Sequence, residues 1–516
     1  MYRKFKLLIM GCAFSLTGFA QGNDVKLDTI DNYQDWGWQC LVAENSYIQL
    51  VIVPEIGGRV LHYGLYGGGY MWVNTDQLGK TYDPDVNVNG PWGSSSGYGG
   101  YKVWPAPQDK WNWPPPPHLA WGPYTFTTEV ANADSIVIYL RSQVETSLTP
   151  GLQMARRYKM YRNSTQVKVQ QILINTNADA QDWSIWDVTQ TIVKHFGETD
   201  YTSFSTYFPA SLNSINGKSN GTYSAVDDNI TKYQFASGKS GKMFSFLSQG
   251  WMSFVDEEDE QSYTKVFEIF PDNNNHPDNN SNFEIYSSGG QYIELEVLSP
   301  IETIDGGGDS ISYDETWYAA RINGAIRGAN HTGIIREKLD FDDTMNHASG
   351  EFGIFNDGSL RVKFFNKDDQ ELSTSEPIPV RATDKYTLSM DLTLPENATV
   401  IKILAYNPEG SYIGVLDEAI VNPASGIESM HSPESCKIFP TLIEKGKPFS
   451  IQTSPVDGEG ITVEIHSLAD GKEAGRFFFP GITDICLVRT DLTEPGVYLV
   501  TVRHSGMVFR EKIIIR

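Results

Sequence analysis

The sequence predicts an all-β protein built mainly from antiparallel sheets. Aromatic residues make up 12% of the 516 residues, and glycine occurs 46 times. Aromatic residues are typical of strands, and glycine is typical of the turns between them. Short segments in which apolar and polar residues alternate recur between turn residues, whereas long apolar repeats at helical spacing are missing. A chain of this length has room for roughly three domains.

The first region runs from residue 24 to residue 327 and contains every tryptophan of the chain. In its middle we expect a meander of three strands, QMARRYKMYRN, TQVKVQQILIN and WSIWDVTQTIV, with a turn at Asn163 and Ser164. Further on, FEIYSS and QYIELEVLS are expected to pair as a hairpin whose turn is the glycine pair Gly289 and Gly290.

Two smaller regions follow, at residues 333–421 and 434–516. Short alternating segments such as LRVKFFN, YTLSMDLTL and VIKILAYNP predict a small β-sandwich for the first. The segment SGIESMHSP at residues 425–433 is expected to be a linker. The segments ITVEIHSLADGK and GVYLVTVRHSGMVFREKIIIR predict a second compact β unit at the end of the chain.

The N-terminal stretch MYRKFKLLIMGCAFSLTGFAQG predicts a secretory signal peptide over residues 1–20. Basic residues precede an apolar run, and small residues precede a cut ahead of Gln21. Cys12 leaves a lipoprotein anchor open as the alternative, but only a short apolar run precedes it. No other segment approaches the roughly 20 apolar residues that span a bilayer. We therefore expect an exported protein, secreted or held at the cell surface, with no membrane span.

The net charge and the cysteines exclude several classes of function. A formal charge of -24 repels phosphates, so we expect no nucleic acid partner. The sequence lacks the Cys/His spacing of a zinc site, and we expect no metal and no cofactor. After the cut three cysteines remain; Cys40 is expected to be a small buried residue, and pairing of Cys436 with Cys486 stays open.

The stretch GGYKVWPAPQDKWNWPPPPHLAWG, residues 99–122, places four tryptophans around a run of four prolines. Proline lacks the backbone donor that a helix interior or a central strand needs, so we expect a stiff loop. Such a loop either is pinned into a core or offers indole faces to a ligand, and both alternatives stay open for different indoles.

The final region resembles the C-terminal sorting domain of proteins exported by the type IX secretion system. KIFPTLIEKGKPFSI, VEIHSLADGK and LTEPGVYLVTV carry the resemblance, although Pro440 and Thr441 stand where the family usually has Asn-Pro. The resemblance implies the type IX machinery as a partner; the alternative is an ordinary β-sandwich module.

Three stretches of the first region resemble the galactose-mutarotase-like superfamily: VIVPEIGGRVLHYGL, RRYKMYRNSTQVKVQQILINTNADAQDWSIWDVTQ and YIELEVLSPIETIDGGGDSISYDETWY. Within it the chain is similar to a branch marked by a GGxKxWPAPQ loop, TQ after a tryptophan, and HPD before EIY. The resemblance implies an antiparallel β-supersandwich with a concave cradle for sugars, here followed by two small β-sandwiches.

The family's catalytic glutamate matches Glu296, which stands two residues after Glu294. Side chains alternate along a strand, so the two glutamates share one face while Ile293, Leu295 and Val297 share the other. We expect the apolar set to face the core and the carboxylates, roughly 6–7 Å apart, to lie in the cradle or in solvent. That spacing suits Glu294 and Glu296 as a catalytic acid/base pair, and it equally suits two solvated glutamates. The resemblance implies Glu296 as a base, with Lys102 or a tyrosine as its partner.

The family's histidines have no counterpart in this chain. At the matching positions the sequence reads SIWDVTQT and GYGGYKVW, and His195 comes too late after its strand. His62 and His118 are candidates only through their neighbouring loops. The departure argues against a simple aldose epimerase.

What remains is a set of residues suited to sugars, because indoles stack on the C–H face of a pyranose while amides and carboxylates take its hydroxyls. Lys102, Arg59 and either Arg156 or Arg157 would bind a uronate or sulfate, or else balance the acidic surface. The predicted sugar-binding residues are Arg59, Trp104, Gln108, Trp111, Trp113, Trp186, Gln190 and Glu284.

Three functions compete at this point. The first is a secreted protein that acts on the sugars of an external polysaccharide, by proton transfer of the epimerase or lyase type. The second is a non-catalytic carbohydrate-binding surface protein, and the third is a structural surface protein.

Overall fold

A computed structural model describes residues 24–93, 97–270 and 275–421, together with parts of residues 436–515. The chain divides into two compact units between residues 422 and 423. The predicted signal peptide and the predicted linker at residues 425–433 lie outside the described residues. The predicted all-β fold is confirmed, since every strand pair except one is antiparallel. The described helices are single turns, and none has the length and apolar character to cross a bilayer.

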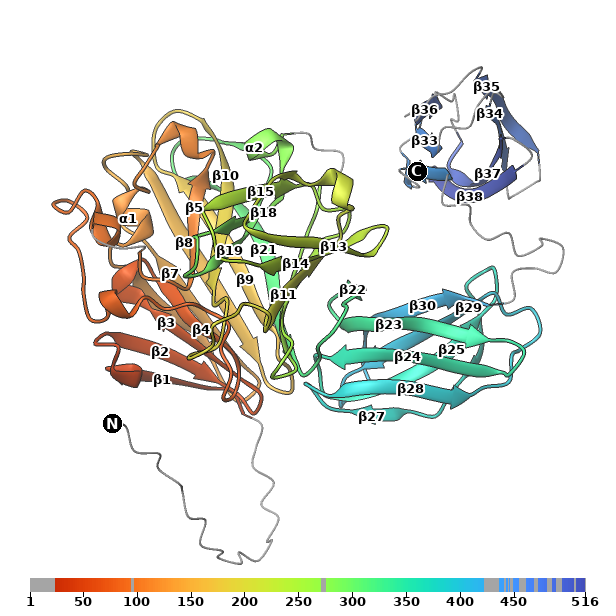
Figure 1. Ribbon diagram of the computed structural model, residues 1–516, viewed down its shortest axis with the longest axis horizontal. Coiled ribbons are helices and arrows are strands. Elements are labelled where there is room, and N and C mark those ends of the chain that lie inside the picture. The colour runs from red at the N-terminus through yellow and green to blue at the C-terminus, as the bar shows by residue number, and fades with distance from the viewer. Residues whose placement is uncertain are drawn as a thin grey trace, which may run out of the picture. The chain divides into compact units, whose positions relative to one another are not determined.

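Two large antiparallel sheets make up the chain as far as Ala320 (Figure 1). The eleven-stranded sheet has the order β1 (Lys26–Asp31), β2 (Gln39–Glu44), β3 (Ile48–Val53), β4 (Arg59–Leu65), β5 (Tyr101–Ala106), β10 (Gln181–Thr191), β19 (Ile293–Leu298), β18 (Phe283–Ser287), β15 (Gly241–Ser245) and β12 (Asn216–Gly217), with β20 (Glu302–Ile304) paired to β10. The ten-stranded sheet has the order β13 (Gly221–Asp227), β14 (Ile230–Phe235), β11 (Phe204–Phe208), β16 (Trp251–Asp256), β17 (Gln261–Phe267), β21 (Asp309–Ala320), β9 (Val167–Asn175), β8 (Leu152–Tyr161), β7 (Ser135–Arg141) and β6 (Thr125–Ala131). The short helices of this part are η1 (Tyr33–Asp35), η2 (Pro54–Ile56), η3 (Thr75–Gln77), η4 (Gly90–Gly93), η5 (Gln108–Lys110), α1 (Pro117–Ala120), η6 (Leu212–Ser214) and α2 (Pro277–Asn280).

The predicted strand alternation is confirmed on β19. Ile293, Leu295 and Val297 are at most 2% exposed and belong to the main apolar core. Glu294 and Glu296 therefore project from the opposite face of the sheet. The hairpin of β18 and β19 also forms as predicted, with a loop at residues 288–292 that contains both glycines.

A buried ion triad lies in the core and joins the two large sheets. Lys265 on β17 contacts the carboxylate of Asp187 on β10, and its Nζ lies 3.3 Å from Oε2 of Glu315 on β21. All three side chains are fully buried. The backbone N–H of Val297 also donates to Oδ1 of Asp187, at 2.6 Å. Burial raises the pKa of Asp187 well above its usual range, and Glu315 raises it further, while Lys265 opposes both.

The expectation of a stiff loop over residues 99–122 is wrong at its start. Residues 101–106 form β5, which pairs along its length with β10 and includes Pro105 opposite Ile185. The strand β4 pairs with β5 only at Tyr101, so the rest of β5 has a single partner. A proline is tolerated there because one side of the strand carries no hydrogen-bond ladder. From residue 107 the segment follows the prediction, with only η5 and α1 as single turns.

The remainder of the first unit is a smaller sandwich of two sheets. One sheet has the order β22 (Gly328–Ala329), β23 (Gly333–Asp342), β24 (His347–Ile354) and β28 (Lys385–Asp391). The other has the order β26 (Glu371–Thr374), β25 (Gly358–Phe365), β29 (Val400–Tyr406) and β30 (Tyr412–Ile420), with β27 (Ile378–Val380) paired to β25. Phe352, Ile401 and Leu416, each fully buried, lie in the apolar cluster between these sheets.

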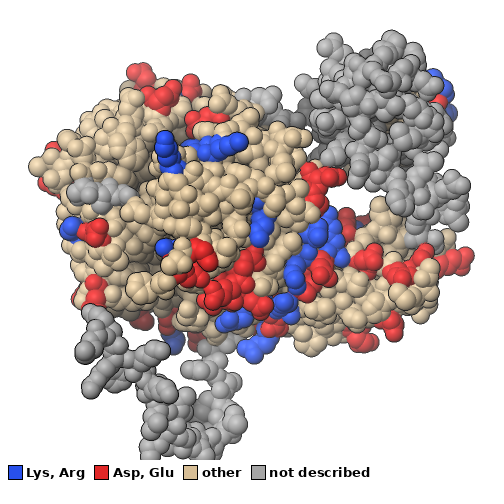
Figure 2. Space-filling view, viewed as in Figure 1, with Lys and Arg blue, Asp and Glu red and all other residues tan. Residues whose placement is uncertain are grey.

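Apolar contact and surface ion pairs join this sandwich to the large sheets. The ring of Phe355 stacks on that of Tyr318 with centroids 4.1 Å apart, within a shared apolar cluster. Figure 2 shows basic and acidic side chains interspersed near β22. Arg327 lies 3.9 Å from Asp227 there. Exposed pairs of this kind contribute about 0–1 kcal/mol, so the stacked rings dominate the contact.

The second unit consists of two further sheets. One has the order β31 (Cys436–Phe439), β33 (Phe449–Thr453) and β36 (Ile485–Val488). The other has the order β32 (Leu442–Ile443), β38 (Met507–Ile515), β37 (Gly496–His504), β34 (Ile461–Ser467) and β35 (Glu473–Phe479), in which β32 and β38 are parallel. Ile451, Val463 and Val500 form part of its core. The side chains of Cys436 and Cys486 lie outside the described residues.

Replacing Lys265 by methionine should destabilise the fold strongly and in a pH-dependent way. Removing one member of a buried ion group typically costs about 3–5 kcal/mol, because the remaining charges are left uncompensated. In the variant Asp187 loses the lysine that lowers its pKa, so its pKa stays raised by burial and the folded state holds a proton that the unfolded chain releases above about pH 4. Stability therefore rises as pH falls, and urea denaturation should show a larger loss at pH 7 than at pH 5. The exposed Lys239→Met is the control, and an equal loss at both pH values would contradict the assignment.

Candidate functional site

Five neighbouring strands, β5, β10, β19, β18 and β15, carry polar and aromatic side chains on the face that points away from the core. Directly paired residues of antiparallel strands project from the same face. The pairing places Trp104 opposite Trp186, and Glu296 opposite Glu284. We call this surface the carboxylate face; its members are Lys102, Trp104, Trp186, Gln190, Lys242, Glu284, Tyr286, Glu294 and Glu296.

Glu294 forms one half of the carboxylate face with two partners from neighbouring strands. The Nζ of Lys102 donates to its Oε1 at 2.9 Å, and the Nε2 of Gln190 donates to the same oxygen at 3.0 Å. The Nζ of Lys102 also lies 4.9 Å from the ring centroid of Trp104. The cation is therefore held between a carboxylate and the negative face of an indole.

Glu296 forms the other half with Glu284, and Lys242 bridges the two. The Nζ of Lys242 lies 2.9 Å from Oε2 of Glu296 and contacts Oε2 of Glu284. The indole Nε1 of Trp186 donates to Oε2 of Glu296 at 2.7 Å, and the Lys242 ammonium stands over the Trp186 ring at 4.6 Å. One cation thus neutralises part of the charge of two fully buried carboxylates.

Burial shifts the pKa values on this face in opposite directions. It lowers the pKa of Lys102 to about 8, although Glu294 works against the shift. It raises the pKa of Glu296, and that of Glu284 well above its usual range, with Lys242 opposing both shifts. For Lys242 itself, burial lowers the pKa, but the two carboxylates outweigh it and raise the value overall. The face therefore holds an acid and bases tuned toward neutral pH.

Several buried polar atoms of the carboxylate face have no hydrogen-bond partner within the described chain. They are Oε1 of Glu284, Oε1 of Glu296, Oε1 of Gln190 and Nε1 of Trp104. A buried donor or acceptor left unpaired costs about 1–3 kcal/mol. A ligand with several hydroxyl groups has the donors and acceptors that these four atoms require.

The indoles of residues 107–122 differ in their surroundings. Trp121 is fully buried, and Trp111 is buried with its Nε1 donating to the carbonyl of Pro105 at 2.9 Å. Trp113 is 55% exposed, and its ring lies 6.3 Å from that of Trp104. Two of these indoles therefore pack as core residues, and Trp113 offers an exposed aromatic face beside the carboxylate face.

Two other predicted residues lie outside the carboxylate face. Arg59 is buried and donates to the carbonyls of Gly99 at 2.8 Å and Ala120 at 3.0 Å, so it holds the two ends of the tryptophan-rich segment. Gln108 lies half-buried at the start of η5.

Sequence reasoning missed Lys242, the cation between the two buried carboxylates. The alternation of Lys242 and Phe244 with the buried Met243 is a short strand signal. That signal is local, whereas the partner strand β18 begins about 40 residues later, and no turn connects them directly.

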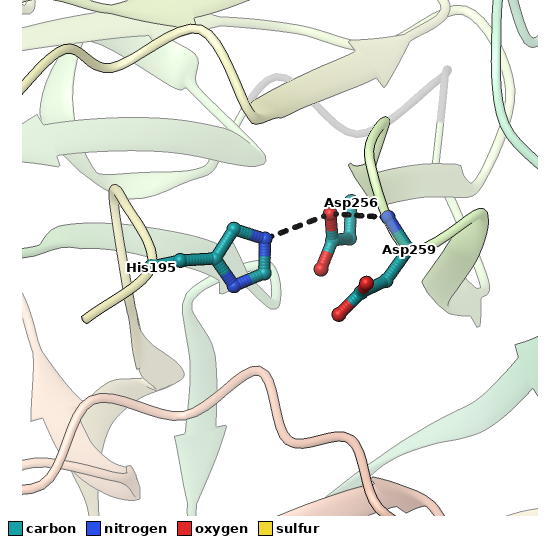
Figure 3. A group of neighbouring side chains, drawn as sticks. All are labelled: His195, Asp256 and Asp259. Carbon is teal, nitrogen blue, oxygen red and sulfur yellow. Dashed lines mark hydrogen bonds and ion pairs between the residues drawn. The ribbon is translucent and has the colours of Figure 1, made fainter. Parts of the chain in front are cut away.

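The three histidines considered from the sequence lie away from the carboxylate face. His195 points toward Asp256, with Nε2 3.1 Å from Oδ1, and Asp259 lies beside them (Figure 3). One ligand atom from each of these three residues lies within 4.8 Å of the others, the geometry of a group that can hold a metal ion. Burial lowers the pKa of His195, but Asp256 outweighs it and raises the value.

The other two histidines are enclosed by the fold. Burial lowers the pKa of His62 to about 4, so it is neutral at physiological pH. His118 is buried between Asp85 at 3.4 Å and Glu145 at 3.5 Å.

The fold and this face define a protein of the antiparallel β-sandwich class with a cluster of buried carboxylates on one sheet. The chain belongs to the family described as "Domain of unknown function (DUF4380)", whose model matches residues 39–320, more than half of the 516 residues. No curated protein matches the sequence.

Solved structures of galactose mutarotase-like proteins are similar to this chain. One is a galactose mutarotase-like protein from Clostridium acetobutylicum, at 12% identity and a TM-score of 0.37, covering 58% of this chain and 98% of that one. A second, from Lactobacillus casei, has 9% identity and a TM-score of 0.36, covering 54% of this chain and 99% of that one. A galactose mutarotase related enzyme from Lactobacillus acidophilus has 9% identity and a TM-score of 0.34, covering 55% of this chain and 98% of that one.

The ammonium of Lys102 should titrate near pH 8, well below an ordinary lysine, because burial disfavours its charged form. NMR of the protein with ¹⁵N-labelled lysine side chains measures this directly, and Lys102→Arg assigns the signal. Glu294→Gln should lower the midpoint further, since it removes the nearest negative charge. The exposed Lys239 serves as the internal control. A midpoint for Lys102 at the ordinary lysine value would show that it is not held in a desolvated site.

Proposed function

We propose that this protein is a secreted carbohydrate-active protein that acts on the sugars of an external polysaccharide at its carboxylate face. The reaction is a proton transfer of the epimerase or lyase type. The observation that carries the proposal is the combination, on one sheet face, of buried carboxylates with unpaired oxygen atoms and indole rings. The hydroxyl groups of a sugar would pair with the carboxylate oxygens, and the C–H face of its ring would pack on the indoles.

Glu296 is the proton acceptor in this proposal. Its Oε2 is occupied by Trp186 and Lys242, whereas Oε1 is buried and has no partner within the described chain. Its pKa is raised by burial, which brings it closer to the pH at which a general base works best. Deprotonated Glu296 takes the proton from a ring carbon or a hydroxyl group of the sugar.

Lys102 is the proton donor. With a pKa of about 8 it is mostly protonated at pH 7, yet it gives up a proton more readily than an exposed lysine. Val188 pairs with Lys102 on one side and with Glu296 on the other, so acid and base are separated by two strand spacings, about 10 Å. Glu294 and Lys242, whose side chains are 13% and 23% exposed, form the part of the cluster that meets an incoming sugar.

The second candidate function is a non-catalytic carbohydrate-binding surface protein. The bridge of Lys242 between Glu284 and Glu296 favours it, because an ion-paired carboxylate is a weaker base than an isolated one. The exposed Trp113 supplies a binding platform under either function.

Replacing Glu296 by glutamine separates the two functions. The amide oxygen still accepts from Trp186, so the fold and sugar binding should persist, while turnover falls by about 10²–10⁴-fold with the loss of the base. A glycan array identifies ligands, and thin-layer chromatography of each array hit detects product. Glu302→Gln, on the exposed part of β20, is the matched control and should retain full turnover.

Each outcome assigns the function differently. Product formation that is lost in Glu296→Gln establishes an enzyme with this base. Binding without product, weakened by Trp113→Ala, establishes the binding protein instead. If no glycan binds, the proposal of a sugar site on this face is wrong.

We propose in addition that the chain leaves the cell through the type IX secretion system. The proposal rests on the N-terminal signal-like stretch and on the resemblance of residues 434–516 to a sorting domain. In a bacterium that has this system, the full chain should be recovered outside the cell or on its surface. Deletion of residues 434–516 should leave the protein in the periplasm. Equal export of both forms would contradict the sorting role.

A further inference from the structure

An aromatic cavity lies beyond the end of β10, outside the carboxylate face. It measures about 660 Å³, and its lining includes Trp72, Lys194, His195, Phe196, Glu198 and Gln291. Aromatic walls with a few charged and amide groups are typical of small-molecule sites. None of these residues belongs to the carboxylate face or takes part in the proton transfer proposed above.

A chain of contacts connects this cavity to the carboxylate face. The backbone N–H of Trp72 donates to the carbonyl of Gln190 at 2.9 Å. The ring of Trp72 lies 4.6 Å from that of Tyr292, which lies 6.5 Å from the ring of Tyr286. Tyr286 pairs directly with Glu294 on the neighbouring strand. An aromatic path therefore leads from the ion-paired glutamate to the wall of the cavity.

The two places are close enough for one short oligosaccharide to reach both. Gln190 and His195 lie five positions apart in the chain, so at most about 17 Å separates them. A chain of a few linked sugars can span that distance.

Phe196 gives the cavity an aromatic group that the fold does not need. Its side chain is fully exposed, at 107%, and Gly197 follows it with a positive φ of 94° and open space around it. The loop is anchored on both sides of this tip. The backbone N–H of His195 donates to Glu198 at 2.8 Å, and the imidazole of His195 contacts Asp256 at 3.1 Å. An exposed aromatic ring on an anchored loop contributes nothing to the core and is suited to stacking on a ligand.

We propose that this cavity is a second sugar subsite, so that the ligand of the carboxylate face is an oligosaccharide and not a free monosaccharide. This inference rests on the proposed function of the carboxylate face. One sugar unit lies at Glu294 and Glu296, the following units pass Tyr286 and Tyr292, and a distal unit packs between Trp72 and Phe196. Lys194, Glu198 and Gln291 take the hydroxyl groups of the distal unit.

Titration calorimetry with oligosaccharides of one to six units tests the subsite. The probes are length series prepared from β-1,4-glucan, xylan, β-1,3-glucan and polygalacturonate. For the series that binds, affinity should rise about tenfold or more between one and four units and then level off, since one aromatic stacking contact accounts for roughly that factor. Phe196→Ala should remove this gain while the shortest ligand keeps its affinity, and Trp72→Phe should reduce the gain in part.

The choice of variants keeps the test independent of folding. Phe196 is fully exposed, so its replacement should leave stability unchanged, and Phe126→Ala, a 39% exposed phenylalanine on β6, is the matched control. If wild type and Phe196→Ala show the same dependence on length, the second subsite is wrong and the proposed function stands. If no series binds at any length, the proposed function fails together with the subsite.

Discussion

The contact between Asp187 and Lys265 is the interaction on which the arrangement of the candidate site depends. Asp187 lies on the core side of β10, where it binds a lysine from the opposite sheet and the backbone of Val297 on β19. Because strand side chains alternate, fixing Asp187 inward fixes its neighbours Trp186 and Val188 outward. The hydrogen bond from the Val297 backbone to Asp187 fixes the register of Val297, and hence of Glu296, relative to β10. The register of the carboxylate face is thus decided inside the core, where a slip of one residue would turn Trp186 toward the core and Asp187 onto the carboxylate face.

The two faces of β10 handle buried charge in different ways. On the core side, three charges share a closed space, and the pKa of Asp187 is raised far from its usual range. On the outer side, Lys242 and Glu294 reach solvent, while Glu296 and Glu284 stay beneath them. A buried ion group adds little net stability, because desolvation offsets most of the attraction. The inner group is accounted for by its role in joining sheets. The outer group joins only neighbouring strands that already share backbone hydrogen bonds. Its desolvation cost is therefore not explained by holding sheets together, and the proposed ligand site accounts for it.

Strand alternation made one part of the site predictable. The sequence around Glu294 and Glu296 alternates cleanly, so the face of both glutamates follows from a period of two. Lys242 could not be predicted in the same way, since its position beside Glu284 depends on a pairing between strands distant in sequence. Pro105 misled the prediction for the opposite reason. The rule that proline avoids central strands looks only at the neighbouring sequence. Whether β5 has a partner on both sides depends on the whole sheet, and β4 pairs with β5 only at Tyr101.

Arg59 explains how one segment supplies both core packing and an exposed indole. Its two terminal nitrogens bind the carbonyls of Gly99 and Ala120, which stand before β5 and at the end of α1. With both ends fixed, the prolines between them leave the intervening backbone few conformations. Trp111 and Trp121 then pack as core residues, and the ring of Trp113, which lies between them in sequence, packs edge to face against Trp92 and Trp104. An aromatic side chain held in place before binding loses little further entropy when a ligand packs on it. In the proposed sugar site, the rigid segment and the anchored loop of Phe196 would each present an exposed aromatic ring from a fixed stretch of backbone.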